Sequence, residues 1–267
     1  MVKIQIQVSK MKQFLDLISC TGGTDEGSKV DKVIKEFVIF ATDNNIETYA
    51  TDKIGKLFAN AKMTVTVLEP GQFTVGDIDN FEKYLSVFDG KDILTISQEA
   101  GVVKMERGSP AKLMKFSTVS IDNIETHKTA ELIHTRWKMT DTDMGTDKTK
   151  LSNTINVRAE DLAQVVSDSR VVGEQHYPFV IMKDAMGQLV LKVEVGSLQT
   201  SMAVIKSMIP AVIQSVEMQN KYAYGFDNVF TTLKGDVKLF TAPNMPLWVV
   251  KEESDYKVRY MLTPVTD

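Results

Sequence analysis

The chain is poor in the residues that carry most enzyme chemistry. It has one cysteine, Cys20, and three histidines among 267 residues. A lone cysteine cannot close an internal disulfide, which agrees with a reducing compartment, and its place after an apolar stretch favours a packed thiol over a nucleophile. The spaced motifs of serine hydrolases, P-loop proteins, zinc proteases, thiol redox proteins and dinucleotide-binding proteins are also absent. The sequence therefore predicts a protein that is not an enzyme and has no catalytic residues.

Long apolar runs and a strong charge of either sign are missing as well. No apolar run approaches the roughly 18 residues of a membrane span. The opening MVKIQIQVSK contains no apolar core of a signal peptide. We therefore expect an intracellular protein with no membrane partner. The net charge of −4 is unlike that of a protein coated in nucleic acid, but it leaves room for a local basic surface.

A strand followed by a short amphipathic helix occurs in each half of the chain. In Ile155–Arg170, a short alternating strand leads into an apolar stripe at helical spacing, made of Leu162, Val165, Val166 and Ser169. Near the N-terminus, alternation in Ile4–Val8 leads into the same kind of stripe, made of Met11, Phe14, Leu15 and Ile18. The repeated pattern indicates an internal duplication.

The remaining predicted elements follow the same order in both halves. Two further helical stripes span Ile78–Phe88 and Tyr222–Leu233. Alternating segments bounded by turn residues predict the strands Phe37–Ala41, Ile46–Ala50, Leu57–Val67, Phe73–Val75, Ile93–Ser97, Val102–Arg107 and Ala111–Val119, then Phe179–Lys183, Gln188–Val195, Gln199–Ile205, Ile213–Met218, Asp236–Thr241, Leu247–Glu252 and Lys257–Leu262. These patterns predict an α+β fold of two similar domains. Each domain would contain about eight or nine strands in antiparallel sheets, together with two helices.

Residues 121–153 have a different character. They are polar, rich in Thr and Asp, and lack a sustained strand pattern. We interpret them as an interdomain connector that contains a short helix within Ile124–Trp137. The predicted domains are therefore residues 1–120 and 154–267.

The best metal-like arrangement lies inside this connector. His127, Glu131 and His134 would share one face of a helix, at positions i, i+4 and i+7. Two solvated histidines in a polar linker explain the same spacing more simply. A metal-dependent enzyme is thus an alternative hypothesis, and we assign no metal site.

The polar faces of the four helices carry the stronger signal. These faces and the adjoining turns hold the basic residues Lys10, Lys12, Lys83, Arg158, Arg170 and Lys234. Asp16, Glu82 and Asp161 share the same helices, so an ordinary solvated surface explains any single helix. Four corresponding helices in a duplicated sheet protein favour a shared concave surface instead.

Several stretches resemble the DNA sliding clamps. NMPLWVVKEESDYKVRYMLTP (Asn244–Pro264) is similar to the final hairpin of the proliferating-cell-nuclear-antigen (PCNA) clamps, and YAYGFDNVFTTL (Tyr222–Leu233) to their last inner helix. INVRAEDLAQVVSDSR and FTVGDIDNFEKYLSVFDGKD (Phe73–Asp92) are more like the corresponding stretches of T-even phage clamps. The resemblance covers both halves in order and leaves 120–153 poorly matched.

This resemblance implies a homotrimeric ring of six such domains, with no cofactor and no chemistry of its own. The ring would encircle duplex DNA without sequence preference, with the six basic residues facing phosphates. It would tether DNA polymerase and other clamp-binding proteins, and a clamp loader would be a further partner. The exposed edge strands Ala111–Val119 and roughly Leu198–Lys206 would join the copies.

The resemblance also implies a partner site beside the C-terminal segment. Met261, Thr263 and Pro264 correspond to a clamp tail that flanks a hydrophobic pocket, and Pro246 to the proline at its base. Ile54 is a candidate for the opposite wall. Because Pro264 cannot donate to a β-ladder, the tail beyond it is expected to leave the sheet.

Two further hypotheses stay open at this level. One is a two-domain polymerase accessory factor that does not close into a ring. The other is a structural sheet protein with no role on DNA, which would give no stimulation of a polymerase.

Overall fold

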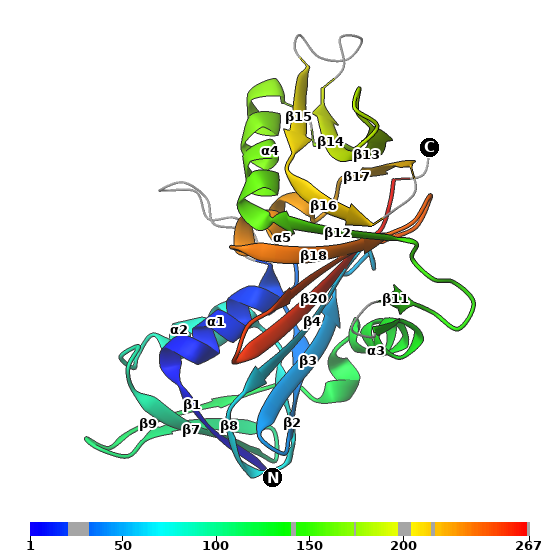
Figure 1. The fold of residues 1–267 in the computed structure, drawn as a ribbon. Coiled ribbons are helices and arrows are strands. Elements are labelled where there is room, and N and C mark those ends of the chain that lie inside the picture. Colours follow the sequence, from blue (N-terminus) through cyan, green and yellow to red (C-terminus); the bar gives the residue numbers. More distant parts are fainter. Residues whose placement is uncertain (21–31, 140–142, 174, 197–203, 215–216, 266–267) are drawn as a thin grey trace. The chain divides into compact units, whose positions relative to one another are not determined.

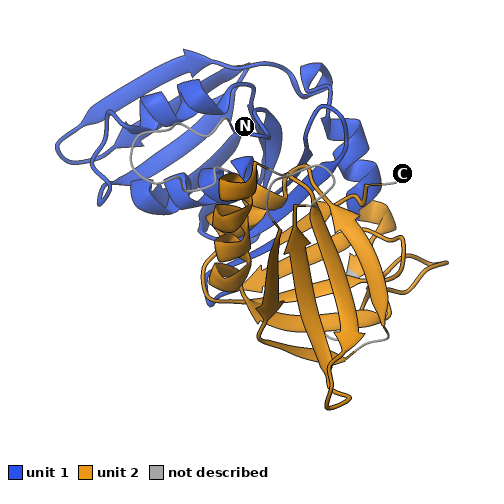
Figure 2. Ribbon diagram, turned by 90° about the horizontal axis from the view of Figure 1, so that it is seen from above, with its two compact units in different colours: residues 1–20, 32–134, 253–258 blue, residues 21–31, 135–252, 259–267 orange. Residues whose placement is uncertain are grey.

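The structure is a computed structural model that describes residues 1–20, 32–139, 143–173, 175–196, 204–214 and 217–265. The chain divides into two compact units, which Figure 2 colours separately. Unit 1 comprises residues 1–20, 32–134 and 253–258, and unit 2 comprises residues 21–31, 135–252 and 259–267. Among the described residues, no helix is both long enough and apolar enough to cross a lipid bilayer.

The first repeat follows the predicted order of strands and helices (Figure 1). Its elements are β1 (Val2–Gln7), α1 (Val8–Ser19), β2 (Phe37–Thr42), β3 (Asn45–Thr51), β4 (Leu57–Thr64), β5 (Thr66–Glu69), β6 (Gly71–Val75), α2 (Ile78–Leu85), β7 (Ile93–Glu99), β8 (Val102–Arg107) and β9 (Lys112–Ser117). The predicted apolar stripe of α1 is fully buried. The Asp77 carboxylate begins α2 by accepting the amide N–H groups of Asp79 and Asn80, at 2.9 and 3.1 Å.

Two sheets carry these elements in unit 1. One is a five-stranded antiparallel sheet in the order β5-β1-β7-β8-β9. In the other, the order β20-β4-β3-β2-β6 includes the Tyr256–Val258 part of β20 (Tyr256–Leu262). Helix α1 packs on β1, β3 and β4 and lies beside α2 (Figure 1). The apolar face of α1 therefore covers sheet residues, and Phe81 of α2 contacts the ring of Phe116 on β9, with centroids 5.7 Å apart.

The second repeat has the same order. Its elements are β12 (Asn153–Arg158), α4 (Ala159–Val172), β13 (Tyr177–Lys183), β14 (Leu189–Val195), β15 (Ile205–Ile209), β16 (Ala211–Gln214), β17 (Met218–Tyr222), α5 (Phe226–Thr232), β18 (Asp236–Thr241), β19 (Leu247–Glu252) and β20. The predicted stripe of α4 is buried, and α4 ends at Gly173, whose φ of 74° is a left-handed conformation that glycine tolerates.

Two sheets also carry the second repeat. One has the order β15-β14-β13-β17, and the other contains β16-β12-β18-β19-β20. Helix α4 packs on α5, β12, β14 and β15. The antiparallel sheets, with two helices in each repeat, confirm the predicted α+β class.

The predicted boundaries differ from the structure at two strand breaks. Leu57–Val67, predicted as one strand, divides at Val65 into β4 and β5, which belong to different sheets. Because the apolar alternation continues through Val65, the pattern alone cannot locate this break. Ile213–Met218, also predicted as one strand, contributes to both β16 and β17, again in different sheets.

The start of the last helix is a second correction. We predict a helix from Tyr222, but β17 extends to that residue and α5 begins at Phe226. Gly225 precedes α5 with a φ of 79°, a left-handed conformation that separates strand from helix. Most of the predicted strand Gln199–Ile205 lies outside the described residues, and β15 begins at Ile205.

The segment between the repeats contains ordered elements. These are the 3₁₀ helix η1 (Ile121–Asn123), α3 (His127–Arg136), β10 (Lys138–Met139) and β11 (Met144–Gly145). Helix α3 confirms the short helix predicted within Ile124–Trp137.

Candidate functional site

Three of the six candidate basic residues lie on α1 and α2. Lys10 forms an ion pair with Asp255, with 2.9 Å between Nζ and Oδ2, and both side chains are half-exposed. Lys12 is half-buried on α1, and Lys83 is exposed in the last turn of α2. The pair with Asp255 already uses the charge of Lys10, so Lys12 and Lys83 are the stronger candidates for phosphate contacts in unit 1.

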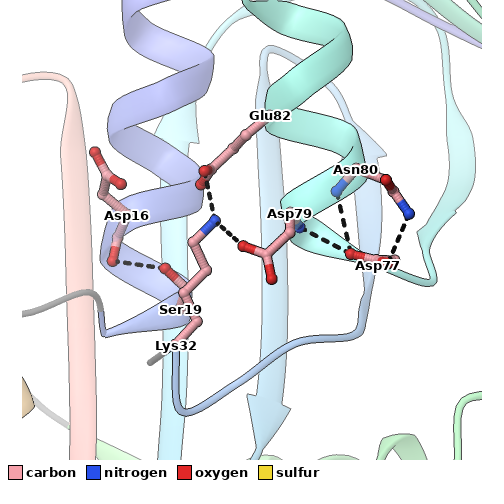
Figure 3. Close-up of polar contacts among 7 residues, drawn as sticks. All are labelled: Asp16, Ser19, Lys32, Asp77, Asp79, Asn80 and Glu82. Atoms are coloured by element: carbon pink, nitrogen blue, oxygen red, sulfur yellow. Dashed lines mark hydrogen bonds and ion pairs between the residues drawn. The ribbon is translucent and has the colours of Figure 1, made fainter. Parts of the chain in front are cut away.

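Carboxylates gather between the same two helices, as Figure 3 shows. Lys32, whose side chain is only 10% exposed, pairs with Asp79 at 2.9 Å and with Glu82. Burial lowers the pKa of Lys32, but its bonds to these two carboxylates outweigh burial and leave the pKa raised. The α1–α2 surface is thus mixed in charge. Lys32 was not a sequence candidate, because no pattern around it distinguishes it from other surface lysines.

Asp16 lies on α1 beside this cluster (Figure 3). Although the residue is exposed overall, desolvation of its carboxyl and the negative charge of Glu82 raise its pKa to about 6, against the opposing effects of Lys32 and Lys12. Ionised Asp16 is therefore unfavourable in the folded protein at neutral pH.

Replacing Asp16 by asparagine is expected to stabilise the protein at pH 8. Because the pKa is raised on folding, the charge of Asp16 opposes folding fully above pH 6, less between pH 6 and 3.8, and not at all below. For a partly exposed carboxyl we expect a gain of roughly 2–4 °C in melting temperature. Melting curves from pH 4 to pH 8 measure it, with the exposed change Glu99→Gln as control. An equal gain at both ends of the pH range would contradict this explanation.

The other three candidate basic residues lie around α4 and α5. The Glu160 carboxylate accepts the N–H of Gly235 at 2.7 Å and lies 3.5 Å from the Arg158 Nε. The bond from Gly235 is the main cause that lowers the pKa of Glu160. Because Lys234 is the neighbour of Gly235, Arg158 and Lys234 lie at the same end of α4, and both are exposed. Arg170 is exposed in the last turn of α4, at the other end.

The histidines of the metal hypothesis make ring contacts. The rings of His127 and His134 stack on Tyr49, with centroids 5.5 and 4.5 Å away and planes within 15° of parallel. Burial lowers the pKa of His127, against the charge of Glu131. In the part of the chain that the structure describes, no three His, Cys, Asp or Glu side chains are arranged to hold a metal ion. These histidines therefore attach α3 to β3, and the metal hypothesis gains no support.

The candidate partner residues near the C-terminus have different surroundings. Pro264 and Val265 line a cavity of about 600 Å³ in unit 2, with Pro178, Gln219, Asn220, Lys221 and Asn244. The Val265 N–H donates to the Lys221 oxygen at 2.7 Å, so Val265 lies beside β17. Pro246 and Thr263 are half-buried, whereas Met261 is 5% exposed and packs in the core.

Ile54 lines a separate cavity in unit 1. The side chain is 62% exposed, and the cavity of about 220 Å³ also includes Glu125 and Thr129 near α3. The Asp52 carboxylate holds the turn by accepting the N–H groups of Leu57 and Ile54, at 2.7 and 3.1 Å. Asp52 is thus a structural residue of the turn, and it presents Ile54 to solvent.

The two repeats, each with antiparallel sheets and two helices, define the fold of the DNA sliding clamps. Among solved structures, the chain is similar to PCNA from Entamoeba histolytica, with a TM-score of 0.70, 12% identity and 99% of each chain covered. It is also similar to a structure of A. fulgidus PCNA bound to the C-terminal region of FEN-1, with a TM-score of 0.71, 13% identity, and 100% of this chain and 99% of that chain covered. No family model and no curated protein sequence matches the chain.

Proposed function

We propose that the protein is a DNA sliding clamp, a processivity factor that encircles duplex DNA as a homotrimeric ring. The observation that carries the proposal is the internal duplication with an open end strand in each repeat. Among the described strands, β9 pairs only with β8, and β15 only with β14. Unpaired end strands invite pairing with another chain, and a head-to-tail contact must close into a ring to avoid a filament.

The charge distribution supports sliding rather than sequence recognition. Contacts to phosphates position a protein on DNA without reading bases, so a sparse set of exposed basic side chains is enough. Lys12, Lys83, Arg158, Arg170 and Lys234 supply that set, and Lys10 joins it if phosphate displaces Asp255. The net charge of −4 would limit adhesion of the remaining surface to DNA.

The ring would act by tethering other proteins and not by catalysis. DNA polymerase and other clamp-binding proteins would dock beside Pro246, Thr263 and Pro264, with Met261 supporting the tail from the core, and with Ile54 as a second contact. Such tethering raises the effective concentration of an enzyme at the template. A clamp loader would place the ring on DNA inside the cell, and no cofactor is required.

The solution mass tests this proposal. Light scattering at micromolar concentration is expected to give about 90 kDa, three times the chain mass of 29.8 kDa. Stimulation of a DNA polymerase on primed circular DNA is the functional readout. A monomer at every concentration that still stimulates the polymerase would favour the non-ring accessory factor, and a monomer without stimulation would favour a structural protein.

A further inference from the structure

Unit 1 contains a junction that fixes the turn before β20. The Asp255 carboxylate pairs with Lys10 of α1 at 2.9 Å. The backbone oxygen of Asp255 accepts the N–H of Thr64, the last residue of β4, at 2.9 Å. Beyond this turn, β20 is the neighbour of β4 in the sheet. A turn from the second repeat is therefore held by one helix residue and one strand end of the first repeat.

The second repeat presents the counterpart of that helix and strand. The first amides of α1 and α4, in Val8 and Ala159, donate to the carbonyl just before β7 and just before β18, at 3.0 and 2.9 Å. Counting from these equivalent positions, Lys10 corresponds to Asp161. Strand β15 corresponds to β4 but has no neighbour on one side among the described strands. Asp161 is half-buried and forms no ion pair with another described residue.

The first repeat presents the counterpart of the turn. The β8–β9 turn corresponds to the β19–β20 turn, and β9 also lacks a neighbour on one side among the described strands. This turn, Gly108–Ala111, has no acid, and the exposed Lys112 follows it. The Lys112 Nζ donates to the Val87 oxygen at 2.6 Å and lies 5.5 Å from the ring centroid of Phe88, both just past α2. Lys112 therefore lies on the helix-bearing side of the sheet, as the Lys10–Asp255 pair does.

We propose that Asp161 of one copy pairs with Lys112 of the next copy, where β15 of the first joins β9 of the second. This inference rests on the proposed ring of copies. The charges are reversed relative to the junction inside unit 1. In that junction the helix supplies the basic residue, Lys10, whereas between copies the helix would supply the acidic residue, Asp161. A wrong pairing of turns would place Lys10 against Lys112 or Asp161 against Asp255, and like charges at a contact disfavour it. The reversed charges would therefore favour the correct partner for each turn: the β19–β20 turn beside α1, and the β8–β9 turn beside α4 of the next copy.

Charge-reversal variants test the pair. Asp161→Lys and Lys112→Glu are each expected to raise the concentration at which half of the trimer dissociates, by about tenfold at low salt. The double variant, in which the two charges are exchanged, is expected to recover most of the lost trimer stability. The difference in dissociation between the single variants and the unchanged protein is expected to shrink at about 0.5 M salt, where exposed charges are screened. Light scattering across a dilution series measures the dissociation, and circular dichroism checks that each variant is folded.

The control is Asp168→Lys, the same charge change two turns further along α4. It is expected to leave the dissociation within about twofold of the unchanged protein. If the unchanged protein is trimeric and neither single variant weakens it, or the double variant does not recover, the pair is overturned while the ring stands. If the unchanged protein is monomeric throughout, the ring and the pair are both overturned.

Discussion

Removing the five residues after Leu262 is expected to abolish binding of the clamp-binding peptide of the cognate DNA polymerase. The removed tail includes Pro264 and Val265, which line the cavity of about 600 Å³, and the N–H of Val265 that donates to β17. Without the tail, a peptide loses both an apolar wall and a backbone partner. The fold is expected to persist because β20 ends at Leu262, so its ladder remains. Calorimetry measures the affinity, and light scattering checks the oligomer.

Two variants sharpen this test. Lys183→Ala, in an exposed side chain of β13 that does not line the cavity, is expected to leave the affinity unchanged. Ile54→Ala reports whether the separate cavity of unit 1 takes part in docking, because its loss would remove an exposed anchor. Unchanged affinity in the truncated protein would place the docking site elsewhere.

Changing Lys12 and Lys83 together to glutamate is expected to weaken processive synthesis about tenfold at moderate salt, and further as salt rises and screens the remaining contacts. Both lysines lie on the helices of unit 1, where the carboxylates of Asp16, Asp79 and Glu82 already offset basic charge. Losing two cations there would leave this surface acidic. The length of products on primed DNA across a salt series is the measurement.

The matched control is a second double variant that changes the net charge by the same amount but at two lysines on strands instead of helices. Lys62 on β4 and Lys183 on β13 are exposed, and changing both to glutamate is expected to leave product length unchanged. The solution mass of both double variants is expected to equal that of the unchanged protein. Normal stimulation by the Lys12 and Lys83 variant at every salt concentration would show that these lysines do not contact DNA as proposed.

The helices were predictable because their signal is local. The stripes of α1 and α4 recur at helical spacing within a dozen residues, and the structure buries every member of both. The strand breaks at Val65 and between β16 and β17 were not predictable, because the alternation of side chains does not record which sheet a strand joins. The duplication could be recognised from the order of elements alone.

The ion pairs in the candidate site could not be predicted from the sequence. Lys10 and Asp255 are separated by 245 residues, and nothing in either neighbourhood identifies the other. The spacing of His127 and His134 correctly placed both on one helical face, but it could not reveal that this face meets Tyr49. Sequence patterns identify faces, whereas tertiary contacts decide what each face meets.

The packing of α3 limits where this chain tolerates engineering. Its histidines rest on Tyr49, and the next residue after α3, Trp137, contacts Trp248, with ring centroids 5.5 Å apart. Shortening residues 121–153, or replacing them with a glycine–serine linker, would uncover those aromatic rings and promote aggregation. The turn at Asp184–Gly187, where Met186 is 82% exposed, is a safer place for a tag, a fluorophore or new chain termini.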